Sequence, residues 1–371
     1  MIETIIGRPL VIGLKIIDVW PNYKNKLCRW FLWSSMALTL ACQISAIMDI
    51  THEGALLMDA VARCITNLLS MMKIVFLWQN RRLIERCFST IERDWHNVSG
   101  DENIAHISRI TLFSRFFTIY LLGTYYFSAT LFVLRSISHY TPEDSGIPRE
   151  LIVRCKCPFD AYRTPAFEFM LAVGWLQTAC LVGGHVVAEG ALAAMIAHAC
   201  GQFDLLRDRI IRLSSAEEVP DIVRTHERII HFVEDIEIIF RWIGLAEFLS
   251  GSTIMCALGF LIVTSLESDL DSGTASLLGS YIVAMFLGEF TYCFLGDILI
   301  EKARGIRDAA YSSSWNDLPP KTSKLLILIM VRADKSLSIT AGNFFALDLQ
   351  SFVNILKTTA SYLSVIRAMY E

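Results

Sequence analysis

The sequence predicts an all-α membrane protein with seven transmembrane helices. Hydrophobic residues make up 54% of the 371 residues and charged residues only 19%, whereas soluble domains average about 25% charged residues. The mean hydropathy is +0.46, and the apolar residues fall in blocks of about 20, the length at which a helix crosses a bilayer. Blocks this long and continuous indicate helices and not the short strands of a barrel.

The same composition excludes several other classes of protein. The chain is too apolar for a disordered protein, a coiled coil or a collagen. The net charge of −4 offers no basic surface to nucleic acid. The sequence contains no phosphate-binding loop, nucleophile elbow or zinc motif. We therefore expect no enzymatic activity, no cofactor and no metal.

Seven blocks are predicted to span the membrane. They are preceded by residues 1–21, which Arg8, Lys15 and Asp18 interrupt, so this part predicts an interfacial or re-entrant segment and not a secretory signal. Six strongly apolar blocks and a more polar seventh block follow. The predicted spans cover residues 28–50, 56–78, 112–134, 166–191, 239–266, 275–299 and 351–370.

The distribution of Lys and Arg predicts a cytosolic N-terminus and an extracellular C-terminus. In this orientation the cytosolic segments contain 22 Lys and Arg residues and the extracellular segments four, as the positive-inside rule requires. Trp30, Trp33, Trp78 and Trp242 then lie at cytosolic ends of spans, as in an interfacial aromatic belt. The orientation is the inverse of a G-protein-coupled receptor, so no G protein is expected as a partner.

Helical patterns continue on the cytosolic side of the spans. In Asp221–Phe240, apolar residues at steps of 7, 4, 3 and 4 make one helix face. Pro319 and Pro320 precede an apolar run of seven residues, 325–331, which is too short to cross a bilayer. We predict a buried cytosolic helix over Lys321–Lys335, either as a core helix of the monomer or as an oligomerisation element.

The last span carries a narrow polar stripe. Polar groups inside a membrane usually face a cavity, a pore or a partner helix. At helical spacing the stripe contains Asn354, Thr358, Ser361, Val365 and Ala368, and Val365 interrupts it. Several copies around an axis would line a pore with one apolar ring, which is what a dewetting gate requires. The alternative is ordinary helix packing through small residues.

The C-terminal residues resemble the terminal signature of the insect odorant receptor family. The matching stretch reads Thr340-Ala341-Gly342-Asn343-Phe344-Phe345, then Leu347-Asp348-Leu349-Gln350-Ser351-Phe352, and continues with Ile355-Leu356-Lys357-Thr358, Ser361-Tyr362 and Arg367. The upstream Pro-Pro-Lys with its Leu-Leu-Ile-Leu-Ile-Met run and the Asp18-Val19-Trp20-Pro21 opening are similar to that family too. The resemblance also extends to the length, the span count and the cytosolic N-terminus.

This resemblance implies an odorant receptor subunit of a ligand-gated, non-selective cation channel at the plasma membrane of a sensory neuron dendrite. Family members assemble as tetramers, usually with a shared co-receptor subunit, so a heterotetramer is expected. The implied parts are residues 1–317 with six spans and the ligand pocket, 318–346 with a cytosolic anchor helix, and 347–371 with the pore-lining helix. Val365 falls on the family's hydrophobic gate, and Ala368 replaces a polar residue of the co-receptor, as in a ligand-tuned subunit.

The resemblance also implies a pocket for a small apolar organic ligand in the outer half of the bundle. Such sites are mostly apolar with a few placed polar groups. The candidate lining residues are Met58, Ala62, Ile65, Tyr126, Thr130, Met170, Gly174, Gln177, Tyr281 and Met285. The alternatives to this function are a gustatory-type receptor channel working without a co-receptor, or a membrane transporter, although no internal repeat supports a transporter.

The charged residues inside the spans and the extracellular cysteines are interpreted as structural and not as functional groups. Asp59 is one turn from Arg63 and is its expected partner. Lys73 is expected to extend its ammonium group toward the interface. His185 and Glu189 share a helix face four residues apart, and without a further ligand this favours packing over a site. Cys155 and Cys157 are extracellular and too close in sequence for an unstrained bond to each other.

The orientation can be tested on the sequon that begins at Asn97. Asn97-Val98-Ser99 is the only glycosylation sequon in the chain, and the predicted topology places it in the cytosol. We expect no glycan on it, because only lumenal and extracellular asparagines are modified. Treatment of the expressed protein with an endoglycosidase should leave its electrophoretic mobility unchanged. A mobility shift on treatment that Asn97→Gln abolishes would contradict the predicted orientation.

Overall fold

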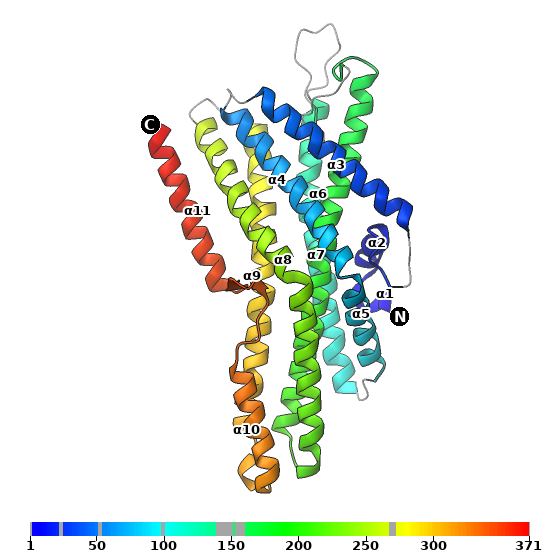
Figure 1. Ribbon diagram of the computed structural model, residues 1–371, viewed down its shortest axis with the longest axis vertical. Helices are drawn as coiled ribbons and strands as arrows, with labels where there is room; N and C mark the ends of the chain where they lie inside the picture. The colour runs from blue at the N-terminus through cyan, green and yellow to red at the C-terminus, as the bar shows by residue number, and fades with distance from the viewer. Residues whose placement is uncertain are drawn as a thin grey trace.

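The computed structural model describes residues 2–21, 25–50, 54–97, 101–138, 151–152, 160–266 and 272–370. These residues form an elongated bundle of nearly parallel and antiparallel helices with one small β-hairpin (Figure 1). The helices are α1 (Ile2–Ile6), α2 (Arg8–Ile16), α3 (Lys26–Asp49), α4 (Gly54–Gln79), α5 (Arg81–Asn97), α6 (Asp101–Ser138), α7 (Ala166–Ile211), α8 (Val219–Leu266), α9 (Ser272–Ser312), α10 (Pro320–Asp334) and α11 (Leu349–Tyr370).

The predicted spans coincide with helices of the structure. Among the residues that the structure describes, six helices are long and apolar enough to cross a membrane, namely α3, α4, α6, α7, α8 and α9, and α11 is the more polar seventh. The all-α membrane fold is therefore confirmed. Four of these helices exceed the membrane thickness, because α6 has 38 residues, α7 has 46, α8 has 48 and α9 has 41. The extensions of α7, α8 and α9 reach the lower end of the bundle in Figure 1, where α8 and α9 pack with α10.

The α8 extension confirms the face predicted from residues 221–240. Its five periodic apolar residues are all buried: Ile222, Ile229, Val233, Ile236 and Phe240. They pack in the main hydrophobic cluster with residues of α7, α9 and α10. The period of 3.6 residues thus places one stripe against the neighbouring helices and leaves the charges on the other side.

The N-terminal segment enters the bundle instead of lying outside it. Leu10, Val11 and Leu14 of α2 are buried against α7. Gly190 of α7 permits the approach, because a Cβ there would lie 3.1 Å from Leu10. At the end of α2 the buried Asp18 carboxylate accepts a hydrogen bond from the Asn25 backbone at 2.6 Å. The interfacial or re-entrant placement of this segment relative to the membrane stays a prediction.

The short helix α10 begins at Pro320, as its prolines predict. It buries only one face, containing Leu326, Ile329 and Ala333. Leu328 and Val331 on the other face are 63% and 66% exposed. Within one chain the helix is therefore buried on one side only, where α8 and α9 cover it, and its role as an oligomerisation element stays a prediction.

A β-hairpin connects α10 to α11. Strands β1 (Thr340–Ala341) and β2 (Phe345–Ala346) pair antiparallel, and Gly342 and Asn343 turn the chain with φ values of +59° and +66°. Glu237 of α8 fixes the hairpin, accepting hydrogen bonds from the Thr340 backbone N–H at 2.8 Å and the Thr340 hydroxyl at 2.5 Å. Asp348 then caps α11, accepting a hydrogen bond from the Ser351 N–H at 2.8 Å.

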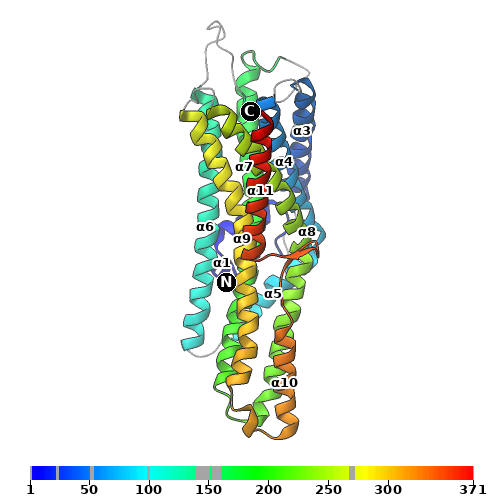
Figure 2. The same cartoon turned by 90° about the vertical axis from the view of Figure 1, so that its left-hand side faces the viewer.

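Helix α11 packs through one face and exposes the polar stripe. Phe352 is buried between Phe286 and Phe290 of α9, with ring centroids 5.1 and 5.7 Å away. The stripe residues Asn354, Thr358 and Ser361 are exposed, and Val365 is 57% exposed. The side chain of Ala368 lies outside the described residues. In Figure 2, α11 runs along the outside of α9 and α8, so the stripe does not pack within its own chain.

The two faces of α10 should respond differently to truncation. Ile329→Ala should destabilise the detergent-solubilised monomer by about 2–5 kcal/mol, because it opens a cavity in the cluster shared with α8 and α9. Leu328→Ala removes a similar side chain from the exposed face and should change the stability by no more than about 0.5 kcal/mol. Thermal unfolding of both variants measures the difference, and equal losses would contradict the burial described for α10.

Candidate binding cavity and adjoining charge cluster

A cavity of about 120 Å³ lies among α4, α6, α7 and α9 and reaches α3. Its wall is mostly apolar and aromatic, with a few polar groups, which is the usual composition of a small-molecule site. The described lining residues are Gln43, Arg63, Thr66, Tyr125, Ser128, Ala129, Phe132, Ile152, Thr178, Leu181, Val182, His185, Tyr281, Ala284 and Met285.

Two of the predicted ligand-binding residues line this cavity and three others support its wall. Tyr281 and Met285 of α9 are lining residues. Met58, Ala62 and Ile65 of α4 belong to the hydrophobic cluster that contains both of them. The Tyr281 hydroxyl is hydrogen-bonded to Thr66 and also donates to the Ala62 carbonyl at 3.3 Å. Helices α4 and α9 thus hold one side of the cavity together.

The predicted residues of α6 do not line the cavity. Tyr126 is 36% exposed and donates to the Ala179 carbonyl at 3.2 Å, and Thr130 is exposed. The lining residues of this helix are their neighbours Tyr125, Ser128, Ala129 and Phe132. One residue corresponds to about 100° of rotation around a helix, so an error of one position in the helix phase turns a lining residue outward.

The predicted residues of α7 lie outside the lining as well. Met170 packs against the cluster of Leu151, Ala161 and Phe167. Gly174 is buried against Ile152, which itself lines the cavity. Gln177 accepts a hydrogen bond from the Ser35 hydroxyl at 2.8 Å. The cavity instead uses residues nearer the middle of α7, including Thr178, Leu181, Val182 and His185.

Arg63 lines one side of the cavity, and contacts with three other residues hold its guanidinium in place. Its guanidinium forms the expected ion pair with Asp59 at 2.9 Å and donates to the Ile152 carbonyl at 2.8 Å. It also lies over the Phe132 ring, 4.8 Å from the centroid. The charge is therefore compensated within the protein.

A buried charge cluster adjoins the cavity. The Lys73 ammonium of α4 lies 3.0 Å from Glu189 of α7 and 2.6 Å from Glu247 of α8, and all three side chains are buried. The expectation that Lys73 reaches the membrane interface is wrong, because two carboxylates from neighbouring helices compensate its charge inside the bundle. The His185 Nδ1 atom is 2.8 Å from the same ammonium.

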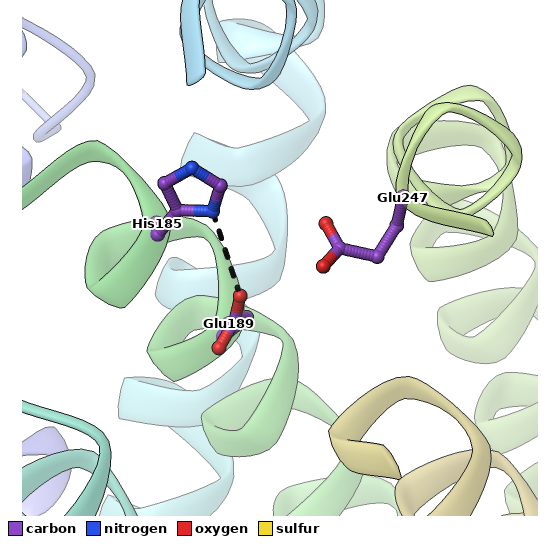
Figure 3. Close-up of side chains that lie close together, drawn as sticks. All are labelled: His185, Glu189 and Glu247. Atoms are coloured by element: carbon purple, nitrogen blue, oxygen red, sulfur yellow. Dashed lines mark ion pairs between the residues drawn. The ribbon is translucent and has the colours of Figure 1, made fainter. Parts of the chain in front are cut away.

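The cluster and the cavity share two side chains. His185 and Tyr125 both line the cavity, and the Tyr125 hydroxyl donates to Glu189 at 2.7 Å. Figure 3 shows His185 and Glu189 on one helix facing Glu247 on another. Sequence reasoning found the His185 and Glu189 pair but missed Lys73 and Glu247, because these residues come from other helices and only the tertiary packing brings them together.

Glycines allow the acidic side chains to fit between α8 and α9. A Cβ at Gly288 of α9 would lie 2.6 Å from the Glu247 Oε1 atom, and a Cβ at Gly251 of α8 would collide with Glu289. Each helix therefore presents a glycine opposite a glutamate of the other. Any larger residue at either position would displace a buried carboxyl group.

The donor set of the cluster resembles a metal site in composition only. The donor atoms of His185, Glu189 and Glu247 lie within 4.8 Å of one another. The Lys73 ammonium, however, contacts all three residues. The positive charge that balances the two carboxylates therefore comes from the Lys73 side chain.

Membrane-length helices around a small cavity define a multi-pass membrane protein with a candidate ligand site, and the comparisons with known proteins specify its kind. The family model of the 7tm odorant receptors matches residues 53–360. Odorant receptor Or2 of Anopheles gambiae is 26% identical, covering 81% of each chain. Odorant receptor 13a of Drosophila melanogaster is 22% identical, covering 92% of this chain and 87% of that one.

The fold is shared with a solved structure as well. The olfactory receptor OR5 of Machilis hrabei in complex with eugenol aligns over 98% of this chain and 97% of that one, with a TM-score of 0.84 and 17% identity. The chain belongs to the 7tm odorant receptor family. The sequence resemblance is thereby confirmed, and the protein is a multi-pass membrane receptor and not an enzyme.

The charge cluster predicts an asymmetric response to neutralisation. Lys73→Met should destabilise the protein by about 3–5 kcal/mol, because it leaves Glu189 and Glu247 buried without a cation. Adding Glu189→Gln and Glu247→Gln to the same chain should recover part of that loss, since no buried charge then lacks a partner. Thermal unfolding in detergent measures both. A Lys73→Met variant as stable as the wild type would show that the ion pairs do not hold the bundle.

Proposed function

We propose that this chain is the ligand-tuned subunit of a ligand-gated, non-selective cation channel that assembles as a heterotetramer with a co-receptor subunit. The observation that carries the proposal is the orientation of α11. Its apolar face packs on α8 and α9, while Asn354, Thr358, Ser361 and Val365 face away from the chain. Exposed polar groups on a membrane-spanning helix are costly in lipid, so they favour a water-filled path.

The single apolar side chain within the polar stripe supports a hydrophobic gate. Val365 is the apolar member of the stripe and is 57% exposed. Copies of Val365 around an axis would form a narrow hydrophobic ring, and such constrictions stop ions by losing their water. Ala368, one turn further along, completes the stripe in the sequence. Residues 347–371 therefore act as the pore-lining part of the chain in this proposal.

The exposed face of α10 supports assembly at the cytosolic end. Leu328 and Val331 lie on it, and Phe344 of the neighbouring hairpin is 77% exposed. Apolar side chains of this size outside the bilayer favour burial against another subunit. Residues 318–346 therefore act as the anchor in this proposal, and residues 1–317 carry the ligand site.

The ligand in this proposal is a small, apolar organic molecule bound in the cavity among α4, α6, α7 and α9. The cavity's apolar wall supports this assignment, as does the eugenol complex of the Machilis hrabei receptor. Burial of apolar area contributes about 25 cal/mol per Å². Shape and burial therefore supply most of the affinity for a volatile molecule.

Co-expression recording tests the proposal. We expect inward cation currents when cells that express this chain with an insect odorant co-receptor receive a chemically broad odorant panel. Cells that express the co-receptor alone provide the control. Surface-labelled protein without any odorant-dependent current would contradict the channel proposal. Robust currents without the co-receptor would instead indicate a gustatory-type channel.

A substitution at Val365 tests the gate directly. Val365→Asn should raise the ligand-independent current several-fold, because a polar ring keeps its water in the closed state. Val365→Leu keeps the ring apolar and should leave the basal current low. Whole-cell currents normalised to surface expression compare the two variants. Equal basal currents in both would remove Val365 from the gate.

A further inference from the structure

We propose that a groove between the N-terminal helices and α6 binds the phosphate group of an anionic phospholipid from the cytosolic leaflet of the membrane. Arg8 of α2 and Arg115 of α6 are the residues that hold the phosphate. The proposal does not depend on channel activity, on the ligand cavity or on a co-receptor. It requires only the multi-pass membrane fold and the predicted cytosolic N-terminus.

The groove lies where the turn between α1 and α2 meets α6. It measures about 320 Å³. A protein cavity of roughly 150 Å³ holds a benzene molecule, so the groove has room for a phosphate group together with the glycerol carbons attached to it. Its described lining residues are Glu3, Ile6, Gly7, Arg8, Pro9, Arg115, Thr118 and Ile119.

Gly7 brings the two arginines to the same groove. Its φ of +94° is open to glycine at no steric cost. A Cβ at this position would lie 3.3 Å from the Arg115 Cγ atom and 3.9 Å from its Nε atom. The Arg115 side chain therefore runs along the turn, directly before Arg8, and both guanidinium groups line one groove.

The charges around the groove favour an anion. Arg8 and Arg115 line it together with one carboxylate, Glu3, and the Lys15 ammonium pairs with that carboxylate at 2.8 Å. Three cations thus stand against one anion. Guanidinium groups bind phosphate oxygens through paired N–H donors. Helix α2 also begins at this turn without a side-chain cap, so the N–H groups of its first turn add partial positive charge.

Exposed apolar side chains continue from both arginines. Four residues after Arg115, Ile119 is 56% exposed, and four residues after Arg8, Ile12 is 56% exposed. Residues four apart lie on the same side of a helix, one turn from each other. Each wall therefore offers a cation and then an apolar surface. A phospholipid uses both through its phosphate and its acyl chains, whereas a free phosphate would use only the cations.

The groove lies at the level of the lipid headgroups. Arg115 is in the first turn of the predicted span 112–134, close to its cytosolic end. Figures 1 and 2 show α1 at about the height at which α11 begins, and α11 is the last membrane-spanning helix. Anionic lipids are abundant in the cytosolic leaflet, and basic pockets between helices on that side bind their headgroups.

Lipid binding to the purified full-length chain tests the proposal. Native mass spectrometry counts the phospholipids that the detergent-solubilised protein retains when dioleoyl phosphatidylglycerol or dioleoyl phosphatidylcholine is added at equal concentrations. The two lipids have the same acyl chains and differ in headgroup charge. We expect the wild type to retain one phosphatidylglycerol molecule at concentrations at which it retains little phosphatidylcholine. High salt should weaken this preference.

Three arginine variants locate the binding. Arg8→Gln and Arg115→Gln should each weaken phosphatidylglycerol binding about fivefold, the factor that corresponds to about 1 kcal/mol per basic residue at an anionic lipid surface. Arg109→Gln is the matched control, because it removes the same charge from an exposed position of α6 outside the described lining. It should change the affinity by less than about twofold. An unchanged unfolding temperature in phosphatidylcholine shows that each variant is folded, and Arg8 is exposed, so at least its variant keeps the test decisive.

Four outcomes would overturn the proposal. Equal retention of the two lipids by the wild type would show that no anionic headgroup is selected. Unchanged affinity in both Arg8→Gln and Arg115→Gln would place the lipid elsewhere. An equally large effect of Arg109→Gln would reduce the preference to a general attraction by the basic surface. Complete displacement of phosphatidylglycerol by an equal concentration of glycerol 3-phosphate, which has no acyl chains, would assign the groove to a soluble phosphate compound.

Discussion

The buried cation of Lys73 is the constraint on which the middle of this bundle depends. Its ammonium group is bonded to side chains of α7 and α8 at once, and the desolvation of a buried charge allows little freedom in how those helices sit. Any sliding of α4 relative to them would separate charges in a medium of low polarity. Helices α4, α6 and α7 of the cavity wall, together with α8, are therefore held in register by an electrostatic and hydrogen-bonding network and not by apolar packing alone.

The network also connects the candidate cavity to the remainder of the chain. Tyr125 and His185 belong to the cavity wall and to the cluster. Glu247 lies against Gly288 of α9, and two phenylalanines of the same helix hold Phe352 of α11. A continuous series of packed groups thus extends from the cavity wall to the helix that carries the polar stripe.

Features that depend on the order of residues along one helix were predictable from the sequence. The spans, the buried face of α8, the start of α10 at its prolines and the Asp348 cap all follow from periodicity or capping, which are local properties. Helix phase was not predictable to one residue: Tyr126 and Thr130, which the sequence places at the ligand site, each lie one position from a residue that lines the cavity, Tyr125 and Ala129. The cluster was missed for a different reason. Lys73 and Glu247 are 174 positions apart, and no pattern in one segment shows that they meet.

The hairpin before α11 has a mechanical consequence. Glu237 fixes Thr340, and Gly296 lies directly against the Leu347 backbone, so the inner end of α11 is fastened to α8 and α9. At 1.5 Å per residue, Val365 lies about 21 Å beyond Ser351. A rotation of about 5° around the fastened end would displace Val365 by about 2 Å. Because α11 is fastened at the hairpin, a small rotation about that end moves the residues at its far end more than those near the hairpin.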